Sequence, residues 1–338
     1  MRALSSWTDV LAGLSAGPLC SLGQTAATMM TGGLARAMLS ELIDYAGLFP
    51  PAQLPLAAAY EAYRRLERSP YAWMLGRFIV PFSRFDDLRD LHGDAAPIAV
   101  SVILDGNRDP VLWLNELSDR LDALATHRAA SAAIEIAALE IPLPPLTAAR
   151  ERYGAALSQV GALLDRAALR ALPCFVEFPR DARWESEMLD AVDSLARTRL
   201  RSKIRCGGTV ASAFPSAAEL AAHLRACAER GVAWKATAGL HHAVAQRDPL
   251  TGFAMHGFVN LLVASCIALQ GAPFEEIEAV LAEQKQQAFS VAESGLAWRG
   301  RNCDLPSIEA ARCRGLLSYG SCSVDEPVED LTAMGWLE

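Results

Sequence analysis

Residues 201–242 read RSKIRCGGTVASAFPSAAELAAHLRACAERGVAWKATAGLHH. Two runs with strand character, at 202–208 and 232–239, flank a run at 216–231 whose apolar residues recur at helical spacing. A strand, a helix and a second strand in this order form the βαβ unit of a parallel sheet, and its two strands are usually neighbours. The stretch therefore predicts two adjacent parallel strands.

The same alternation continues along the rest of the chain. Six further strand-like runs lie at 41–49, 73–82, 97–106, 131–141, 172–179 and 316–324. Helical patterns lie between them at 54–69, 110–127, 146–170 and 183–200. Eight strands alternating with helices predict an α/β fold of the (β/α)8 TIM-barrel type. A doubly wound open sheet with a small C-terminal lobe is the alternative.

An insertion interrupts this pattern between the seventh and eighth strands. It holds two helical runs, at 253–271 and 273–284, and a hairpin-like run at 288–302. With no internal repeat or low-complexity linker, we expect one barrel domain over residues 38–338. Residues 1–37, rich in small side chains and without clear periodicity, are expected to be a poorly ordered N-terminal extension.

The composition limits the classes of partner and the compartment. The 338 residues are 52% hydrophobic and carry a formal charge of −8, so no basic surface for nucleic acid is expected. The apolar run at 258–272 is too short to span a bilayer, which argues against membrane insertion. Eight cysteines without a CxxC pair are typical of free thiols in the reducing cytoplasm. The sequence leaves open assembly into a homo-oligomer.

Lysine is rare in this chain, and its placement suggests chemistry. Of 31 basic residues only Lys203, Lys235 and Lys285 are lysine, which leaves 31 − 3 = 28 arginines. Alternation along the strands places Lys203 with Arg205, and Lys235 with Thr237, on the inward face. Lys203, Arg205 and Lys235 would then lie close together inside the barrel. Their mutual repulsion is expected to lower the pKa of a lysine amine and so to activate it as a nucleophile. The competing interpretation is that the lysines form ion pairs with barrel carboxylates such as Glu135 and Glu177 and only fill the interior of the barrel, without a catalytic role.

Two motifs in this region resemble those of a known family. KATAG (235–239) resembles the Lys-Thr-Ser-Thr-Gly strand of class I aldolase barrels of the deoxyribose-phosphate aldolase type, and KIRCGG (203–208) resembles the lysine and double-glycine strand of that family. The order of the two strands is reversed here. The resemblance implies a Schiff-base lysine whose pKa a second lysine lowers. Strand position would make Lys203 the nucleophile, but the local motif favours Lys235. We expect Lys235 to attack the carbonyl, with Lys203 and Arg205 lowering its pKa or binding an anionic group.

Because barrel enzymes place their chemistry at the C-terminal ends of the strands, residues there are the further candidates. Proton transfer is expected from Asp105, Glu177, His241 and His242. Substrate binding is expected from Asp44, Arg77, Glu135, Arg205, Gly207, Gly208, Thr237 and Ser321. The two glycines, ahead of a helix that opens near Ser216, would offer backbone N–H groups to a phosphate or carboxylate.

The sequence thus predicts a lyase of aldolase type that acts without a cofactor on a small carbonyl compound, which could be anionic or phosphorylated. One alternative is a hydrolase or isomerase that uses a divalent metal on His241, His242 and His256 with strand-end carboxylates. Another is a non-catalytic barrel that binds an anion or serves as a partner subunit.

Overall fold

The computed structural model describes residues 32–337 except 108, 147–149, 180–183 and 293–294. Eight parallel strands close into a barrel in the order β1-β13-β7-β6-β5-β4-β3-β2. They are β1 (Ile43–Tyr45), β2 (Leu75–Pro81), β3 (Ile98–Ile103), β4 (Ile134–Pro142), β5 (Cys174–Glu177), β6 (Arg201–Arg205), β7 (Trp234–Thr237) and β13 (Leu316–Ser321). Every one lies within a run predicted as a strand or within a residue of it. The (β/α)8 prediction is confirmed, and the open-sheet alternative is wrong because the sheet closes on itself.

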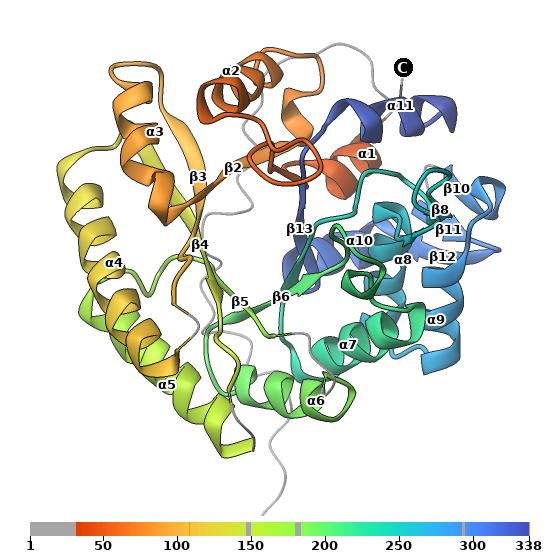
Figure 1. Ribbon diagram of the computed structural model, residues 1–338. Helices are drawn as coiled ribbons and strands as arrows, with labels where there is room; N and C mark the ends of the chain where they lie inside the picture. The colour runs from red at the N-terminus through yellow and green to blue at the C-terminus, as the bar shows by residue number, and fades with distance from the viewer. Residues whose placement is uncertain (1–31, 108, 147–149, 180–183, 293–294, 338) are drawn as a thin grey trace, which may run out of the picture. The chain divides into compact units, whose positions relative to one another are not determined.

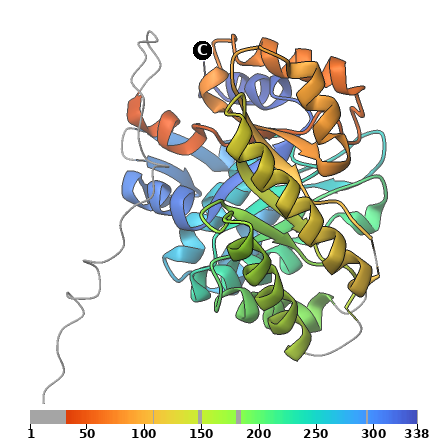
Figure 2. The ribbon, with the colours of Figure 1, turned by 90° about the vertical axis from the view of Figure 1, so that its left-hand side faces the viewer.

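The helices surround the strands (Figure 1). They are α1 (Gly32–Leu39), α2 (Leu56–Leu66), α3 (Phe85–His92), α4 (Pro110–Ala130), α5 (Arg150–Arg166), α6 (Trp184–Leu195), α7 (Ala217–Arg230), α8 (Phe258–Leu269), α9 (Phe274–Ala282), α10 (Leu305–Arg314) and α11 (Asp325–Ala333). Short 3-10 turns are η3 (Ala72–Met74), η4 (Phe82–Arg84), η5 (Ala211–Ala213) and η6 (Gln286–Ala288). Figure 2 shows α4 and α5, in yellow and yellow-green, side by side on the outside of the barrel.

Local sequence signals explain where the helices begin and end. The Asp109 side chain accepts hydrogen bonds from the amides of Val111 and Leu112, and Pro110 takes the first helical position of α4. Helix α7 begins with a capping box and ends at Gly231, whose φ of 67° is the left-handed conformation that favours glycine. Residues 32–37, expected in the extension, belong to α1; the rest of that predicted extension, residues 1–31, lies outside the described residues.

The apolar face of each strand packs outward against the helices. On β6 and β7 this face holds Ile204, Trp234 and Ala236, all buried. Polar side chains of the alternate positions therefore point into the barrel, as expected from the period of two in a strand.

The predicted insertion between the seventh and eighth barrel strands is present and is more elaborate than expected. A short antiparallel pair, β8 (Gln246–Arg247) and β9 (Ala254–Met255), precedes α8 and α9. The expected hairpin, β10 (Phe289–Ala292) and β11 (Gly295–Trp298), gains a third strand, β12 (Arg301–Asp304). Residues 258–268 of α8 are all buried, which accounts for their apolar run. None of the described helices combines the length and hydropathy that crossing a bilayer requires.

Candidate active site

A polar network fills the middle of the barrel, and each of the eight strands contributes to it. Its members, in strand order from β1 to β13, are Asp44, Arg77, Ser101, Glu140, Glu177, Lys203 with Arg205, Lys235 and Ser318. A closed barrel brings together residues as distant as Asp44 and Ser318. The network contains four basic side chains and three carboxylates, one positive charge in excess when all are ionised.

Lys235 lies at the closed side of this network. Its Nζ donates to Asp44 Oδ2 and to Glu140 Oε1, each at 2.7 Å, and all three side chains are fully buried. Nζ also lies 5.4 Å from the centre of the Phe175 ring. Asp44 additionally accepts from Ser318 Oγ at 2.7 Å and from the backbone N–H of Arg77 at 2.9 Å. Both carboxylates around this amine therefore interact with several donors.

Lys203 lies on the strand next to that of Lys235, as the sequence predicted, and the two residues are in register. Its Nζ is 2.7 Å from Glu140 Oε2 and 2.8 Å from Glu177 Oε2. Glu177 in turn accepts from Arg205 Nε at 3.0 Å. Side-chain exposure rises from 3% at Lys203 to 14% at Glu177 and 48% at Arg205. The network thus reaches solvent on the Glu177–Arg205 side.

The charges alternate along the network instead of crowding. Burial alone would raise the pKa of Glu140, but Lys203 and Lys235 outweigh it and hold that pKa well below its usual range. Burial would lower the pKa of Lys203, yet Glu140 and Glu177 raise it. The expectation that clustered cations lower the pKa is therefore wrong for Lys203, because a carboxylate stands between this amine and each of its basic neighbours.

The pKa values of the other two carboxylates follow the same logic. In each case burial opposes ionisation, and the basic neighbours more than compensate. Lys235 and Arg77 lower the pKa of Asp44, and Lys203 and Arg205 lower that of Glu177. All three acids are thus ionised at neutral pH, which fixes the network as a set of charged pairs.

Sequence reasoning missed three network residues, Ser101, Glu140 and Ser318, and on β4 it expected Glu135 in place of Glu140. Both lie on β4, but Glu135 is exposed and Glu140 is fully buried. The pairing of β4 with β3 shifts by one residue between Ile136 and Ala138. A bulge of this kind reverses the inward and outward faces beyond it. Glu140 lies in the same predicted strand, so the sequence showed a carboxylate there. It did not show that the side chain faces the inside of the barrel, because the bulge could not be predicted.

Among the remaining predicted residues, some border the network and others do not. Arg77 pairs with Asp44 at 3.5 Å. Thr237 lies beside Gly320 of β13, where an added Cβ would meet its Oγ1 at 3.1 Å. Asp105 instead accepts from the Ser83 backbone N–H at 3.2 Å, and the Ser321 hydroxyl accepts from the Ser323 backbone N–H at 3.3 Å. These contacts of Asp105 and Ser321 are typical of loop and turn geometry.

Gly207 and Gly208 lie where β6 ends, beside the loop that follows β7. A Cβ on Gly207 would stand 2.7 Å from Gly239 Cα, so glycine permits the two loops to touch. The helix beyond begins at Ser216 as predicted. Ser216 Oγ accepts from the Glu219 amide, and Glu219 Oε2 accepts from the Ser216 amide at 2.6 Å. The cap thus occupies the amides of Ser216 and Glu219, whereas the predicted anion site rests on the amides of Gly207 and Gly208.

The three histidines proposed as metal ligands have separate partners. His241 Nδ1 contacts Glu326 Oε2 at 3.0 Å, and His242 Nδ1 contacts Asp330 Oδ2 at 3.2 Å. His256 Nε2 lies 2.7 Å from the carbonyl oxygen of Pro215. Within the described part of the chain, no three side chains of His, Cys, Asp or Glu group as metal ligands would. The donor geometry therefore does not support the metal alternative.

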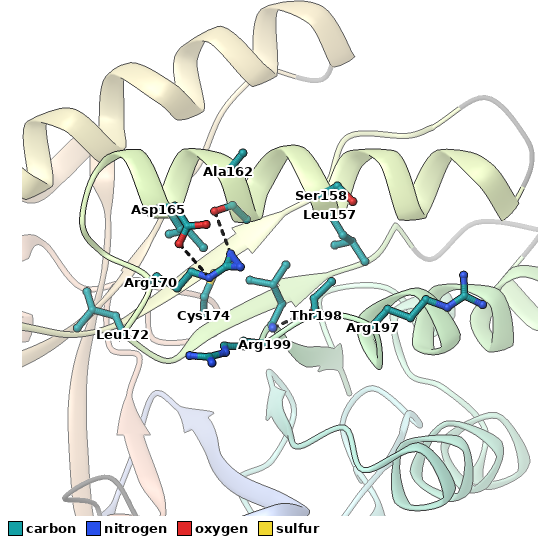
Figure 3. A pocket seen from close by; sticks show the side chains of 13 residues that line it. Leu157, Ser158, Ala162, Asp165, Arg170, Leu172, Cys174, Arg197, Thr198 and Arg199 are labelled. Carbon is teal, nitrogen blue, oxygen red and sulfur yellow. Dashed lines mark hydrogen bonds and ion pairs between the residues drawn. The ribbon is translucent and has the colours of Figure 1, made fainter. Parts of the chain in front are cut away.

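A cavity of about 300 Å³ lies at the opposite, N-terminal end of the barrel (Figure 3). It is lined by α5 and by the segments that enter β5 and β6. Arg170 lies between α5 and β5, pairs with Asp165 at 3.0 Å and donates to the Gly161 carbonyl at 3.2 Å. The Arg197 side chain extends away from Arg170 (Figure 3). Barrel enzymes carry their chemistry at the other end, so we assign this cavity no part in the site.

Comparisons with protein-family models, curated proteins and solved structures find no match to this chain. The aldolase resemblance implies an eight-stranded parallel barrel, and the structure shows this barrel. The chemistry of the site is therefore argued from its residues alone.

Proposed function

We propose that the protein is a lyase of the aldolase type, which makes or breaks a carbon–carbon bond of a small carbonyl compound through a lysine imine. The observation that carries this proposal is the pair of buried lysines on adjacent strands, bridged by the two oxygens of Glu140. Amines are the side chains that form imines with carbonyl carbons, and an imine accepts the electron pair of the bond that breaks.

The exposure gradient favours Lys203 over Lys235 as the reacting amine. Both partners of Lys235 are fully buried, whereas Glu177, the second partner of Lys203, has 14% of its side chain exposed. Opening of the contact between Glu177 and the exposed Arg205 would admit a carbonyl compound to Lys203 first. This differs from the choice of Lys235 that the local motif suggests.

The carboxylates supply the proton transfers that the amine needs. The Lys203 ammonium must lose a proton before its nitrogen can attack, and both Glu140 and Glu177 lie within 2.8 Å of it. Because these charges raise the pKa of Lys203, the proton leaves only after the contact between Glu177 and Arg205 opens, which makes Glu177 a better acceptor. The same groups can return a proton to the carbinolamine oxygen as water leaves. Lys235 then remains the buried cation that keeps Glu140 ionised. The excess positive charge and Arg205 favour a substrate with an anionic group.

Reductive trapping tests this function. The protein is incubated separately with pyruvate, acetaldehyde and dihydroxyacetone phosphate, reduced with borohydride and digested for peptide mass spectrometry. We expect with at least one probe an adduct on Lys203 that exceeds labelling of Lys285, an exposed lysine of the same chain. The K203R variant keeps the charge and should lose the adduct.

The other outcomes are equally informative. An adduct on Lys235 would support the imine and change the assigned nucleophile. Labelling of both buried lysines no stronger than that of Lys285, with every probe, would contradict the imine mechanism. In that case the non-catalytic anion-binding barrel gains support, and equal phosphate affinity of the wild type and K203R would favour it.

A further inference from the structure

A cysteine, a histidine and a glutamate meet at the C-terminal end of the barrel, apart from the lysine network. Cys322 directly follows β13, His241 lies in the loop after the neighbouring strand β7, and Glu326 lies in the first turn of α11. His241 Nδ1 is 3.0 Å from Glu326 Oε2 and 3.8 Å from Cys322 Sγ. Both contacts are made by the same ring nitrogen, so the Nδ1–H of His241 lies between the Glu326 carboxylate and the Cys322 sulfur. A histidine paired with a carboxylate beside a thiol is one of the settings in which a thiol is activated.

The burial of the three side chains suits such a role. The His241 side chain is 9% exposed and that of Glu326 is 46% exposed. Cys322 is partly exposed, whereas five of the seven cysteines in the described part of the chain are buried. Cys322 thus keeps part of its surface in contact with solvent, and the imidazole beside it is held by Glu326.

The charge of the imidazole also favours a reactive sulfur. Burial would lower the pKa of His241, but hydrogen bonds to Cys322 and Glu326 raise it to about 9. His241 is therefore an imidazolium at neutral pH. A positive charge next to a thiol stabilises the thiolate, which is the nucleophilic form.

We propose that Cys322, with His241 and Glu326, is a nucleophilic thiol that adds reversibly to aldehydes. The thiolate sulfur forms a bond to the carbonyl carbon, and the π electrons of the carbonyl move to its oxygen. That oxygen takes the proton from His241 Nδ1, which gives a hemithioacetal without any oxidant or leaving group. His241 regains a proton from solvent, or from the hemithioacetal hydroxyl when the adduct dissociates and the thiolate re-forms.

The surrounding backbone favours addition to an aldehyde over acyl transfer. Acyl transfer needs backbone N–H groups that point at a developing oxyanion. Here the amide of Ser323 donates to the Ser321 hydroxyl, and the amide of Glu326 donates to the Ser323 hydroxyl, each at 3.3 Å. These donors are engaged with fixed backbone neighbours. A hemithioacetal oxygen needs a single proton, which the Nδ1–H that His241 shares between Glu326 and Cys322 supplies as the sulfur leaves it for the carbonyl carbon.

Alkylation by iodoacetamide at pH 7, followed for each cysteine by peptide mass spectrometry, tests the thiol. Cys313 is the internal control because it is exposed and lies on a different element, α10. We expect Cys322 to react about ten-fold faster than Cys313. H241Q should remove that advantage. H242Q, which alters the neighbouring imidazole that pairs with Asp330, should keep it.

The aldehyde is tested in the same assay. Acetaldehyde should slow the alkylation of Cys322 in a saturable way and leave Cys313 unaffected, and ethanol should protect neither. Equal rates at Cys322 and Cys313, or no effect of H241Q, would overturn the activated thiol. A fast Cys322 that acetaldehyde does not protect would overturn the proposed ligand. K203R should behave as wild type here, so this result is independent of the imine proposal.

Discussion

Replacement of Glu140 by glutamine tests whether the network holds the barrel together through charge. Glu140 is fully buried and contacts Lys235 Nζ at 2.7 Å, Lys203 Nζ at 2.7 Å and Ser101 Oγ at 2.6 Å. Glutamine keeps the shape of the side chain but removes the negative charge between two ammonium groups. The variant therefore isolates electrostatics from packing.

The expected cost follows from the loss of one partner in a buried ion pair. Such a loss typically costs about 3–5 kcal/mol because the remaining charge stays buried without compensation. The free energy of unfolding of a whole domain is only about 5–15 kcal/mol. With a slope near 2 °C per kcal/mol for a chain of this length, we expect Tm to fall by roughly 6–10 °C.

Thermal unfolding of E140Q and E135Q, side by side, provides the measurement. Glu135 lies on the same strand but is exposed, so E135Q should change stability by less than about 0.5 kcal/mol. The deficit of E140Q should shrink as the pH rises from 7 toward 10, since an unpaired buried amine can lose its proton. If E140Q and E135Q unfold at the same temperature, the network does not stabilise the barrel as we argue.

Three further predictions concern other parts of the fold. Burial lowers the pKa of His223 to about 4. The stability that the neutral, buried imidazole contributes is therefore present above pH 6.5 and is lost as the pH falls through 4, at a cost of about 3 kcal/mol. Denaturant titrations of H223L should show a weaker loss of stability over this range. The pKa of His241 is raised to about 9, so its contribution to stability depends on pH in the opposite direction: it is present below pH 6.5 and is lost as the pH rises through 9. Because Glu326 is half exposed, we expect the free energy of unfolding to fall by only about 1–2 kcal/mol over this range in denaturant titrations, and H241Q should not show this fall. A Cβ on Gly257 would stand 2.5 Å from the Ala243 carbonyl oxygen, so G257A should destabilise the protein by about 1–3 kcal/mol. Gly154 of α5 has open space around it, so G154A should stabilise the protein by up to about 1 kcal/mol. Equal unfolding temperatures of the two variants in calorimetry would contradict the close approach at Gly257.

The strands could be predicted because a parallel barrel buries them on both sides. Short apolar runs between amphipathic helices are what such burial requires, and the runs at 202–208 and 232–239 became β6 and β7. The third strand of the insertion, β12, was missed because RNCD has no alternating apolar pattern. Its pairing with β11 is decided by tertiary contact rather than by propensity.

The site was predicted in part for the same reason. Lys203 and Lys235 follow from strand alternation, since regular strands place every second side chain in the lumen. Glu177 and Asp44 follow from their place toward the C-terminal ends of predicted strands. Glu140 does not follow, because the bulge in β4 changes the face on which it lies. The contact between Cys322 and His241 was also beyond sequence reasoning, as it joins residues 81 positions apart from loops on two strands.

By itself the sequence determined the number of barrel strands, the βαβ order and the presence of two inward lysines, since these depend on local periodicity. Only the tertiary structure decided which charges meet. Ring closure placed Asp44 of the first strand against Lys235 of the seventh, and the bulge placed Glu140 between both lysines. The sign of an electrostatic effect depends on the nearest opposite charge, so the sequence indicated crowded cations where the folded barrel holds alternating pairs.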